Sequence, residues 1–266
     1  DGLCAVPYAR WDKEAEYVVG KNDTAAHVHF GGFIPVIDLW DGGMFGVMHS
    51  EAVQVDPQQR FLLTSTVSGI QQGGQTIASI KGSDRGVIVG ISSTEYAAWY
   101  TKTGAGLTPY TALHGCLSVA CGRLSYTFGL TGPSYSVDTA CSSSLVATHM
   151  ASGLLHSGAA HSSMAAGVSL TLLCNAFSVF QTSGMLAADG RCKTLDQTGD
   201  GYVRAEACGV VQMHLEEEHD SDVMMYVSGT TVNQDGRSSS LTAPNGPSQQ
   251  AAIRSAMSNG DVQVAG

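Results

Sequence analysis

Apolar and polar residues alternate along a short segment that ends at a cysteine. In residues 134–137 the larger side chains of Tyr135 and Val137 alternate with serines, and this period of two predicts a β-strand. Residues 142–156 contain no proline, and their only glycine is Gly153, so a helix is expected there. Small residues between the two segments allow a tight turn. The pattern therefore predicts a strand that turns sharply into a helix at Cys141.

The predicted helix carries apolar residues all round its surface. Leu145, Met150 and Leu155 fall on different sides of the helical wheel, and no Asp, Glu, Lys or Arg occurs between Thr139 and Ala188. A helix of this kind is expected to be covered on every side. A membrane span is the rival interpretation, but glycines, serines and three histidines interrupt the run. We therefore expect the middle layer of a soluble fold and no membrane span.

Other segments show the periods of strands and helices in alternation. Asp56 followed by Pro57 is typical of a helix start, because Asp caps free N–H groups and Pro suits the first helical position. Strands are predicted at residues 86–91, 164–170 and 209–215, and helices at residues 110–126 and 248–257. This order of strands and helices predicts an α/β protein.

The position of Cys141 at or near a helix N-terminus favours a reactive residue. Free backbone N–H groups and the positive end of the helix dipole favour a thiolate over a thiol, and the thiolate is the nucleophile. The alternative is a buried, inert cysteine, because free cysteines are among the most buried residues. The strand, the small-residue turn and the serines after Cys141 favour the nucleophile.

Composition narrows the function classes. The 266 residues are 43% hydrophobic and 14% charged, so much of the chain is interior, and the net charge is -10. No basic cluster is present to neutralise phosphates, which argues against nucleic acid and anionic membranes as partners. The seven cysteines are an odd number without the spacing of a disulfide framework, so a reducing compartment such as the cytoplasm is expected. The chain starts at Asp1 without a signal segment, and we interpret it as part of a longer polypeptide.

Three patterns resemble ligand sites but lack essential residues. His27 and His29 alternate on a predicted loop without a nearby cysteine or carboxylate. Residues 196–201 resemble half of an EF-hand loop, but Ala207 occupies the position of the bidentate Glu. Residues 104–106 have Pro109 at the third glycine position of a dinucleotide fingerprint. The sequence therefore predicts neither a metal nor a nucleotide site.

Residues 137–145, from Val137 to Leu145, resemble the active-site motif of the β-ketoacyl synthase (ketosynthase) domain of type I polyketide synthases, in the thiolase-like superfamily. Further blocks resemble the same family in the same order. They are residues 10–12, 31–33, 56–60, 122–126, 129–133, 189–193, 199–204, 233–237 and 241–247. The resemblance implies a thiolase-like layered αβαβα fold, here incomplete. It implies a single partial ketosynthase domain over residues 1–266, with a first pseudo-repeat to about residue 222 and the start of a second over residues 223–266.

The resemblance also implies a reaction. Cys141 would accept an acyl group from a thioester on the phosphopantetheine of an acyl carrier protein, for decarboxylative Claisen condensation with a malonyl-type extender in polyketide or fatty acid biosynthesis. Decarboxylation places negative charge on a thioester oxygen, which needs preorganised donors. The family supplies two histidines for this, in motifs beyond residue 266. We therefore expect acyltransfer chemistry in the full-length parent, self-acylation at most in this chain, and no bound cofactor.

Further implications concern a substrate contact and partners. Phe180 matches a family segment whose aromatic residues border the acyl pocket, although ordinary core packing is an equal alternative. The family forms homodimers in which the strand before the cysteine pairs with its copy, and other polyketide synthase domains are expected neighbours. Two alternatives stay open: a noncatalytic, truncated protein that binds acyl groups or pairs with a complete subunit, and a cysteine hydrolase. The hydrolase is disfavoured because no nucleophile elbow of the Gly-x-Ser-x-Gly type and no histidine partner is evident.

Overall fold

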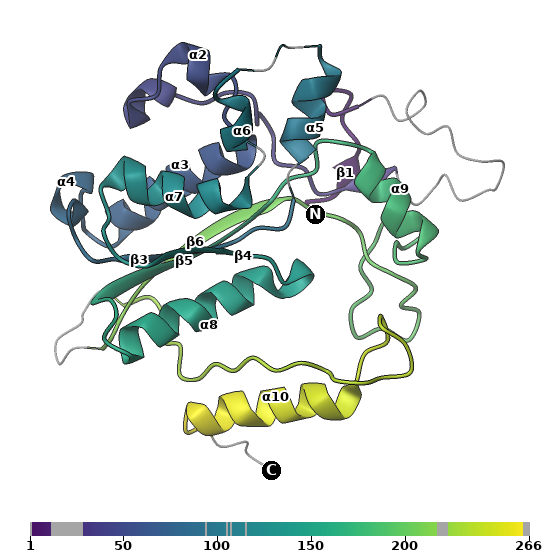
Figure 1. Ribbon diagram of the computed structural model, residues 1–266. Coiled ribbons are helices and arrows are strands. Elements are labelled where there is room, and N and C mark those ends of the chain that lie inside the picture. Colours follow the sequence, from purple (N-terminus) through teal and green to yellow (C-terminus); the bar gives the residue numbers. More distant parts are fainter. Residues whose placement is uncertain are drawn as a thin grey trace.

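The computed structural model describes residues 2–11, 29–93, 95–104, 106, 108–114, 116–216 and 223–262. At its centre is a four-stranded sheet with the strand order β4-β3-β5-β6 (Figure 1). The strands are β3 (Gly86–Gly90), β4 (Ser134–Val137), β5 (Ser162–Ser169) and β6 (Ala207–His214). Strand β3 pairs in parallel with β4 and β5, whereas β5 and β6 are antiparallel. The strands predicted before Cys141 and at residues 86–91, 164–170 and 209–215 are confirmed.

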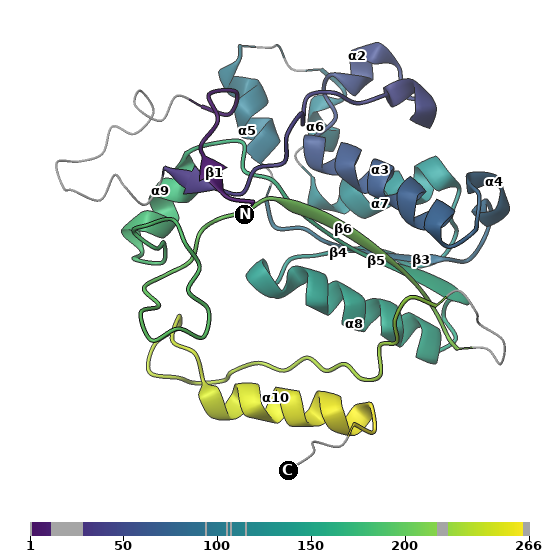
Figure 2. The same ribbon diagram turned by 180° about the vertical axis from the view of Figure 1, so that it is seen from behind.

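Helices cover the two faces of this sheet. Helices α3 (Pro57–Gln72) and α7 (Leu117–Phe128) lie on one face, and α8 (Ser143–His156) lies on the other (Figures 1 and 2). All five residues of β3 are buried because both of its faces are covered. Val87 and Val89 point into the core under α3 and α7, while Ile88 packs against α8. The predicted α/β class is confirmed as a three-layer arrangement.

Helix α3 begins where the sequence predicts. The Asp56 side chain accepts a hydrogen bond from the Gln58 backbone N–H at 2.8 Å, and Pro57 occupies the first turn. The helix predicted over residues 110–126 is instead two helices, α6 (Thr111–His114) and α7. The reason is Cys116, whose extended backbone (φ −101°, ψ 117°) interrupts the helix and makes this residue the N-cap of α7.

Helix α8 differs from its prediction in its surroundings. Small residues on one side, Ala147 and Ala151, are buried against Ile88 and Ala165 of the sheet. On another side Leu145 is 74% exposed. The expectation of cover on every side is therefore wrong for this chain, because the sheet buries only one side of the helix. In the described structure, part of the uncharged surface of α8 is therefore exposed to solvent.

The C-terminal part is partly as predicted. Helix α10 (Gly246–Asn259) contains the predicted helix 248–257, and the Asn245 side chain caps it by accepting a hydrogen bond from the Ser248 N–H at 3.3 Å. Residues 223–245, described in full, contain no strand, so the apolar start of the expected second pseudo-repeat stays unpaired here. In both views α10 lies beyond α8, on the side away from the sheet (Figures 1 and 2).

Short elements complete the described chain. They are β1 (Cys4–Ala5), β2 (Phe30–Gly31), η2 (Gly42–Phe45), α2 (His49–Ala52), α4 (Ile77–Ile80), α5 (Glu95–Lys102), η3 (Ala140–Ser142) and α9 (Asn175–Thr182). Across the described ranges, no helix is long and apolar enough to cross a membrane.

Candidate active site

The segments that follow the three parallel strands β3, β4 and β5 all lie at one edge of the sheet. Residues 91–93 follow β3, η3 with Cys141 follows β4, and residues 170–174 follow β5. Strand β6 runs the other way, so its first residue, Ala207, lies at the same edge, paired with Ser169. Ligand sites of α/β sheets commonly lie outside the carboxyl ends of the strands. Cys141 lies at this edge.

The turn that carries Cys141 is strained. Ala140 has a φ of 54°, in the left-handed region that residues with a side chain rarely adopt, at a cost of about 1–2 kcal/mol. The 3₁₀ turn η3 then leads directly into α8, with Cys141 immediately before the N-cap residue Ser142. The sharp change of direction leaves Cys141 exposed. The predicted passage from strand to helix at this cysteine is confirmed.

Side-chain hydrogen bonds hold the strained turn. The Asp138 carboxylate accepts a hydrogen bond from the Ala140 N–H at 2.9 Å. The Ser143 hydroxyl accepts one from the Thr139 N–H at 2.9 Å and donates one to the Ala140 carbonyl at 2.7 Å. The Ser142 hydroxyl donates to the Thr139 carbonyl at 2.9 Å. Polar side chains on both sides of Cys141 therefore fix the backbone that presents its thiol.

Glycines in two strands let α8 approach the sheet at its first turn. A Cβ added at Gly90 would stand 2.6 Å from the Ser143 carbonyl carbon, and one added at Gly167 would stand 2.7 Å from the Ser144 Cβ. These distances are shorter than real Cβ contacts, so only glycine fits at either position. Strands β3 and β5 thus support the first turn of α8 and fix the distance of the Cys141 turn from the sheet.

The N-terminus of α8 favours negative charge beside Cys141. The helix has 14 residues, no acidic residue in its first turn, and no capping hydrogen bond from the side chain of its N-cap Ser142 to a helix N–H group. Its first N–H groups and the positive end of its dipole are available to stabilise an anion near the turn. An exposed cysteine at such a position is suited to nucleophilic attack on a carbonyl carbon.

Phe180 lies in a separate aromatic cluster. Its ring is 4.6 Å from the Arg204 guanidinium carbon and 6.4 Å from the Tyr202 ring centroid, and it packs near Phe177. These contacts do not join Phe180 to Cys141. Its role as a substrate contact stays a prediction.

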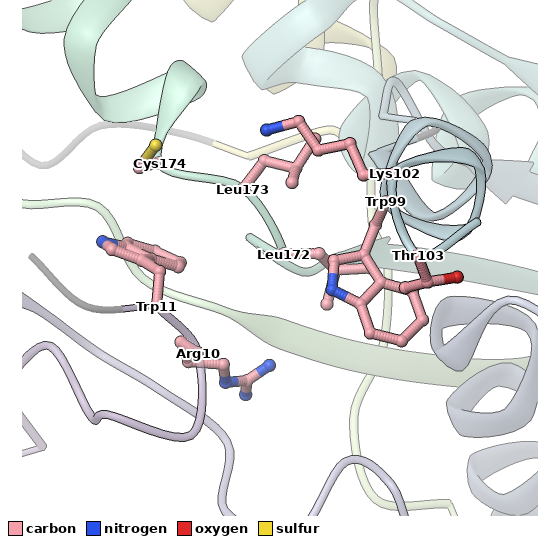
Figure 3. A pocket seen from close by; sticks show the side chains of 8 residues that line it. All are labelled: Arg10, Trp11, Trp99, Lys102, Thr103, Leu172, Leu173 and Cys174. Carbon is pink, nitrogen blue, oxygen red and sulfur yellow. The ribbon is translucent and has the colours of Figure 1, made fainter. Parts of the chain in front are cut away.

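A cavity of about 220 Å³ lies between the N-terminal segment, α5 and the segment after β5. Figure 3 shows the side chains of Trp11 and Trp99 on opposite sides, with Leu172 between them. The lining residues are Arg10, Trp11, Trp99, Lys102, Thr103, Leu172, Leu173 and Cys174. Because Cys141 is not among them, this cavity is distinct from the immediate surroundings of the thiol.

The histidines do not form a site with Cys141 in the described residues. His149 of α8 is half-buried, and its Nδ1 lies 2.8 Å from the Thr230 hydroxyl. His27, considered as a metal ligand with His29, lies outside the described residues. Within the part that the structure describes, no group of three or more His, Cys, Asp or Glu side chains is placed to hold a metal.

Sequence reasoning missed a set of buried acidic side chains at the same edge. Asp56 is 3% exposed, and this burial raises the pKa of its carboxyl to about 6. Burial also raises the pKa of Glu206, whose side chain is 1% exposed and 2.8 Å from Arg10. Glu95 accepts hydrogen bonds from the backbone after β5. The sequence marks Asp56 as a helix cap but does not reveal its burial. No local pattern marks Glu95 and Glu206, because their partners are distant along the chain.

Comparison with known proteins agrees with the fold. Residues 1–219 match the family model "Beta-ketoacyl synthase, N-terminal domain". The chain is 38% identical to polyketide synthase GfsB of Streptomyces halstedii over 264 residues, which are 97% of this chain and 5% of that protein. It is 38% identical to the spectinabilin polyketide synthase system protein NorA' of Streptomyces orinoci over 261 residues, 97% of this chain and 7% of that protein.

Solved structures of ketosynthases resemble the whole described architecture. An oxazolomycin ketosynthase domain, OzmH KS7, of Streptomyces albus JA3453 superposes with a TM-score of 0.88 at 28% identity, covering 98% of this chain and 45% of that one. The ketosynthase from module 6 of the bacillaene synthase of Bacillus subtilis 168 gives 0.85 at 27% identity, with 98% and 43% covered. The chain thus spans less than half of each solved ketosynthase, which agrees with an incomplete thiolase-like fold. This chain belongs to the β-ketoacyl synthase family of the polyketide synthases and spans the N-terminal domain of that family.

Proposed function

We propose that Cys141 is the nucleophile that accepts an acyl group in a β-ketoacyl synthase reaction. The observation that carries the proposal is the strained, exposed turn at the N-terminus of α8, held by Asp138 and Ser143. Such a turn is suited to present a thiolate to a carbonyl carbon while nearby N–H groups stabilise negative charge.

The first half-reaction transfers the acyl group. The Cys141 thiolate attacks the carbonyl of an acyl thioester on the phosphopantetheine of an acyl carrier protein. A new carbon–sulfur bond forms, and the pantetheine thiolate leaves and takes up a proton. A thiolate is both a good nucleophile and a good leaving group, so the acyl group can be passed on.

The second half-reaction forms a carbon–carbon bond. A malonyl-type thioester loses carbon dioxide, and the resulting carbanion equivalent attacks the acyl carbonyl, so that the Cys141 thiolate leaves and a β-ketoacyl thioester forms. The charge on the extender oxygen needs positioned donors. The resemblance assigns these to two histidines in motifs beyond residue 266, so we assign condensation to a longer polypeptide. Residues 1–222 and 223–266 then belong to successive pseudo-repeats of a single domain.

Strand β4 supports a homodimer. It lies at the end of the strand order, paired in the described residues only with β3, and Tyr135 at its centre is 47% exposed. An edge strand of this kind can pair with a copy of itself. The proposed partners are therefore a second copy, an acyl carrier protein and other polyketide synthase domains. The odd number of cysteines, without the spacing of a disulfide framework, supports a reducing compartment such as the cytoplasm.

The test uses a polypeptide that contains this chain together with the remainder of a ketosynthase domain. With acyl and malonyl carrier-protein thioesters, the wild-type protein should release carbon dioxide and form the β-ketoacyl thioester. Cys141→Ala should abolish the product, whereas Cys192→Ala, which alters another exposed cysteine, should leave it unchanged. Product formation by Cys141→Ala at the wild-type rate would exclude Cys141 as the acyl acceptor. Acyl binding by a wild-type protein that forms no product would favour the noncatalytic alternative.

A further inference from the structure

Four consecutive backbone N–H groups after β5 are all bound by side-chain acceptors. The Leu170 N–H donates to the Gln58 Oε1 at 3.3 Å, and the Thr171 N–H donates to a Glu206 carboxylate oxygen at 2.9 Å. The next two N–H groups, of residues 172 and 173, donate to the same Glu95 oxygen at 2.7 and 2.9 Å. The three acceptors come from α3, α5 and the residue before β6, so three separate elements hold one short segment.

Two of these acceptors, Gln58 and Glu206, are costly to bury. Gln58 is 1% exposed, and the Glu206 side chain is also 1% exposed. A carboxylate removed from water is tolerated only where hydrogen bonds and opposite charge compensate. Glu206 meets this condition through its second oxygen, which accepts hydrogen bonds from Arg10 Nη2 and the Ile34 N–H, both at 2.8 Å. Hydrogen bonds therefore compensate both oxygens of the buried Glu206 carboxylate.

Residues 170–173 connect strand β5, which supports the Cys141 turn, to α9. Gly167, three residues before the segment, lies directly under Ser144 in the first turn of α8. Beyond the segment come Cys174 and then α9, which carries Phe177 and Phe180. Residues 170–173 thus lie between the strand that supports the Cys141 turn and α9.

We propose that Glu95 and Glu206 are positioning residues that set which acyl groups Cys141 accepts, by fixing α9 and Phe180 through residues 170–173. This inference rests on the proposed function of Cys141 and on Phe180 as a border of the acyl pocket. Glu95 binds two adjacent N–H groups with one oxygen, so loss of its side chain leaves both without this acceptor. We expect a longer acyl chain, which extends further from the sulfur toward the pocket border, to be affected more than a two-carbon chain.

The test compares acyl groups of different length on the complete chain. Acetyl and hexanoyl thioesters of pantetheine are offered to the wild-type chain and to Glu95→Ala, Glu95→Asp and Glu95→Gln, and acylation of Cys141 is followed by intact mass against thioester concentration. In Glu95→Ala the hexanoyl-to-acetyl ratio of kcat/KM should change about tenfold, mainly through KM, as expected for the loss of one or two partly buried hydrogen bonds. Glu95→Asp keeps the charge but is shorter by one methylene, so it should show the same change.

Two controls separate positioning from a general loss of structure. Glu95→Gln retains a side-chain oxygen that can accept from both N–H groups, so it should restore the wild-type ratio. Glu51→Gln alters a carboxylate outside this set, which pairs with Arg123 at 3.0 Å, and should leave the ratio unchanged. If Glu95→Ala does not fold, the hexanoyl-to-acetyl ratio of Glu95→Asp is compared with that of the wild type instead.

Three results would overturn the inference. The first is an unchanged ratio in a folded Glu95→Asp variant. The second is an equal loss for both acyl groups, which indicates a purely structural role. The third is a wild-type chain that is not acylated at all; this result overturns the proposed function itself and is distinguishable because it needs no variant.

Discussion

Gly90 and Ser143 lie so close together that a single added methyl group at Gly90 would stand 2.6 Å from the Ser143 carbonyl carbon. The end of β3 therefore supports the first turn of α8 through direct backbone contact. Because the obstructing atoms belong to the backbone, no side-chain rotation can relieve the clash. The position of the Cys141 turn depends on this contact and on the strained residue Ala140.

Gly90→Ala should destabilise the chain by about 1–3 kcal/mol, the usual cost of overpacking a close contact. The matched control is Gly153→Ala in α8. An added Cβ at Gly153 meets no atom within 4 Å, so alanine should raise the unfolding free energy by roughly 0.5–1 kcal/mol through helix propensity. Urea denaturation followed by circular dichroism measures both changes. A Gly90→Ala protein as stable as the wild type would show that α8 does not rest on β3 as described.

Ala140→Gly should relieve the strain of the turn, because glycine adopts a φ of 54° without a steric penalty. We expect an unfolding free energy equal to or up to about 1 kcal/mol above that of the wild type. Ala140→Val should lower it by more than about 1 kcal/mol, because a β-branched residue fits this conformation poorly. Thermal denaturation and alkylation of Cys141 by iodoacetamide measure stability and presentation of the thiol. Equal stability of the Gly and Val variants would contradict the strained geometry.

Asp56→Asn should flatten the dependence of stability on pH. Burial raises the pKa of Asp56 from 3.8 to about 6 in the folded chain, so the folded state holds its proton to higher pH than the unfolded state does. Its contribution is therefore present below about pH 4 and is lost as the pH rises through about 6, a difference of about 3 kcal/mol. Asparagine cannot ionise but can still cap α3.

Denaturation of the two proteins between about pH 4 and 7 tests this expectation, and Glu206 contributes equally to both. The unfolding free energy of the wild type should fall more steeply with rising pH than that of Asp56→Asn. Parallel curves would show that the Asp56 carboxyl is not held protonated by its burial.

Local patterns are sufficient to predict most of the regular elements. The period of two around Tyr135, the apolar run of β3 and the Asp56 cap each depend on neighbours in sequence, and each prediction is confirmed. Contacts between residues distant along the chain are harder to predict from the sequence. The uncharged surface of α8 predicts complete burial, yet Leu145 is exposed because what a helix packs against is not encoded in its own residues.

The candidate site is predictable only in part, for the same reason. Cys141 follows from a contiguous motif, and the structure places it in the expected turn. The hydrogen bonds of Glu95 and Glu206 to residues 171–173 join residues 35 to 78 positions apart, so no spacing along the chain reveals them. The positive φ of Ala140 is also not predictable from the sequence, because alanine rarely adopts it.

The most direct test of Cys141 as the acyl acceptor is the acylation of this chain itself. The wild type, Cys141→Ala and Cys192→Ala are incubated with hexanoyl-pantetheine, and the modified residue is identified by intact mass and peptide mapping. We predict one hexanoyl group per chain, located at Cys141, lost in Cys141→Ala and retained in Cys192→Ala. Acylation that persists in Cys141→Ala, or that is spread equally over the exposed cysteines, would contradict this assignment.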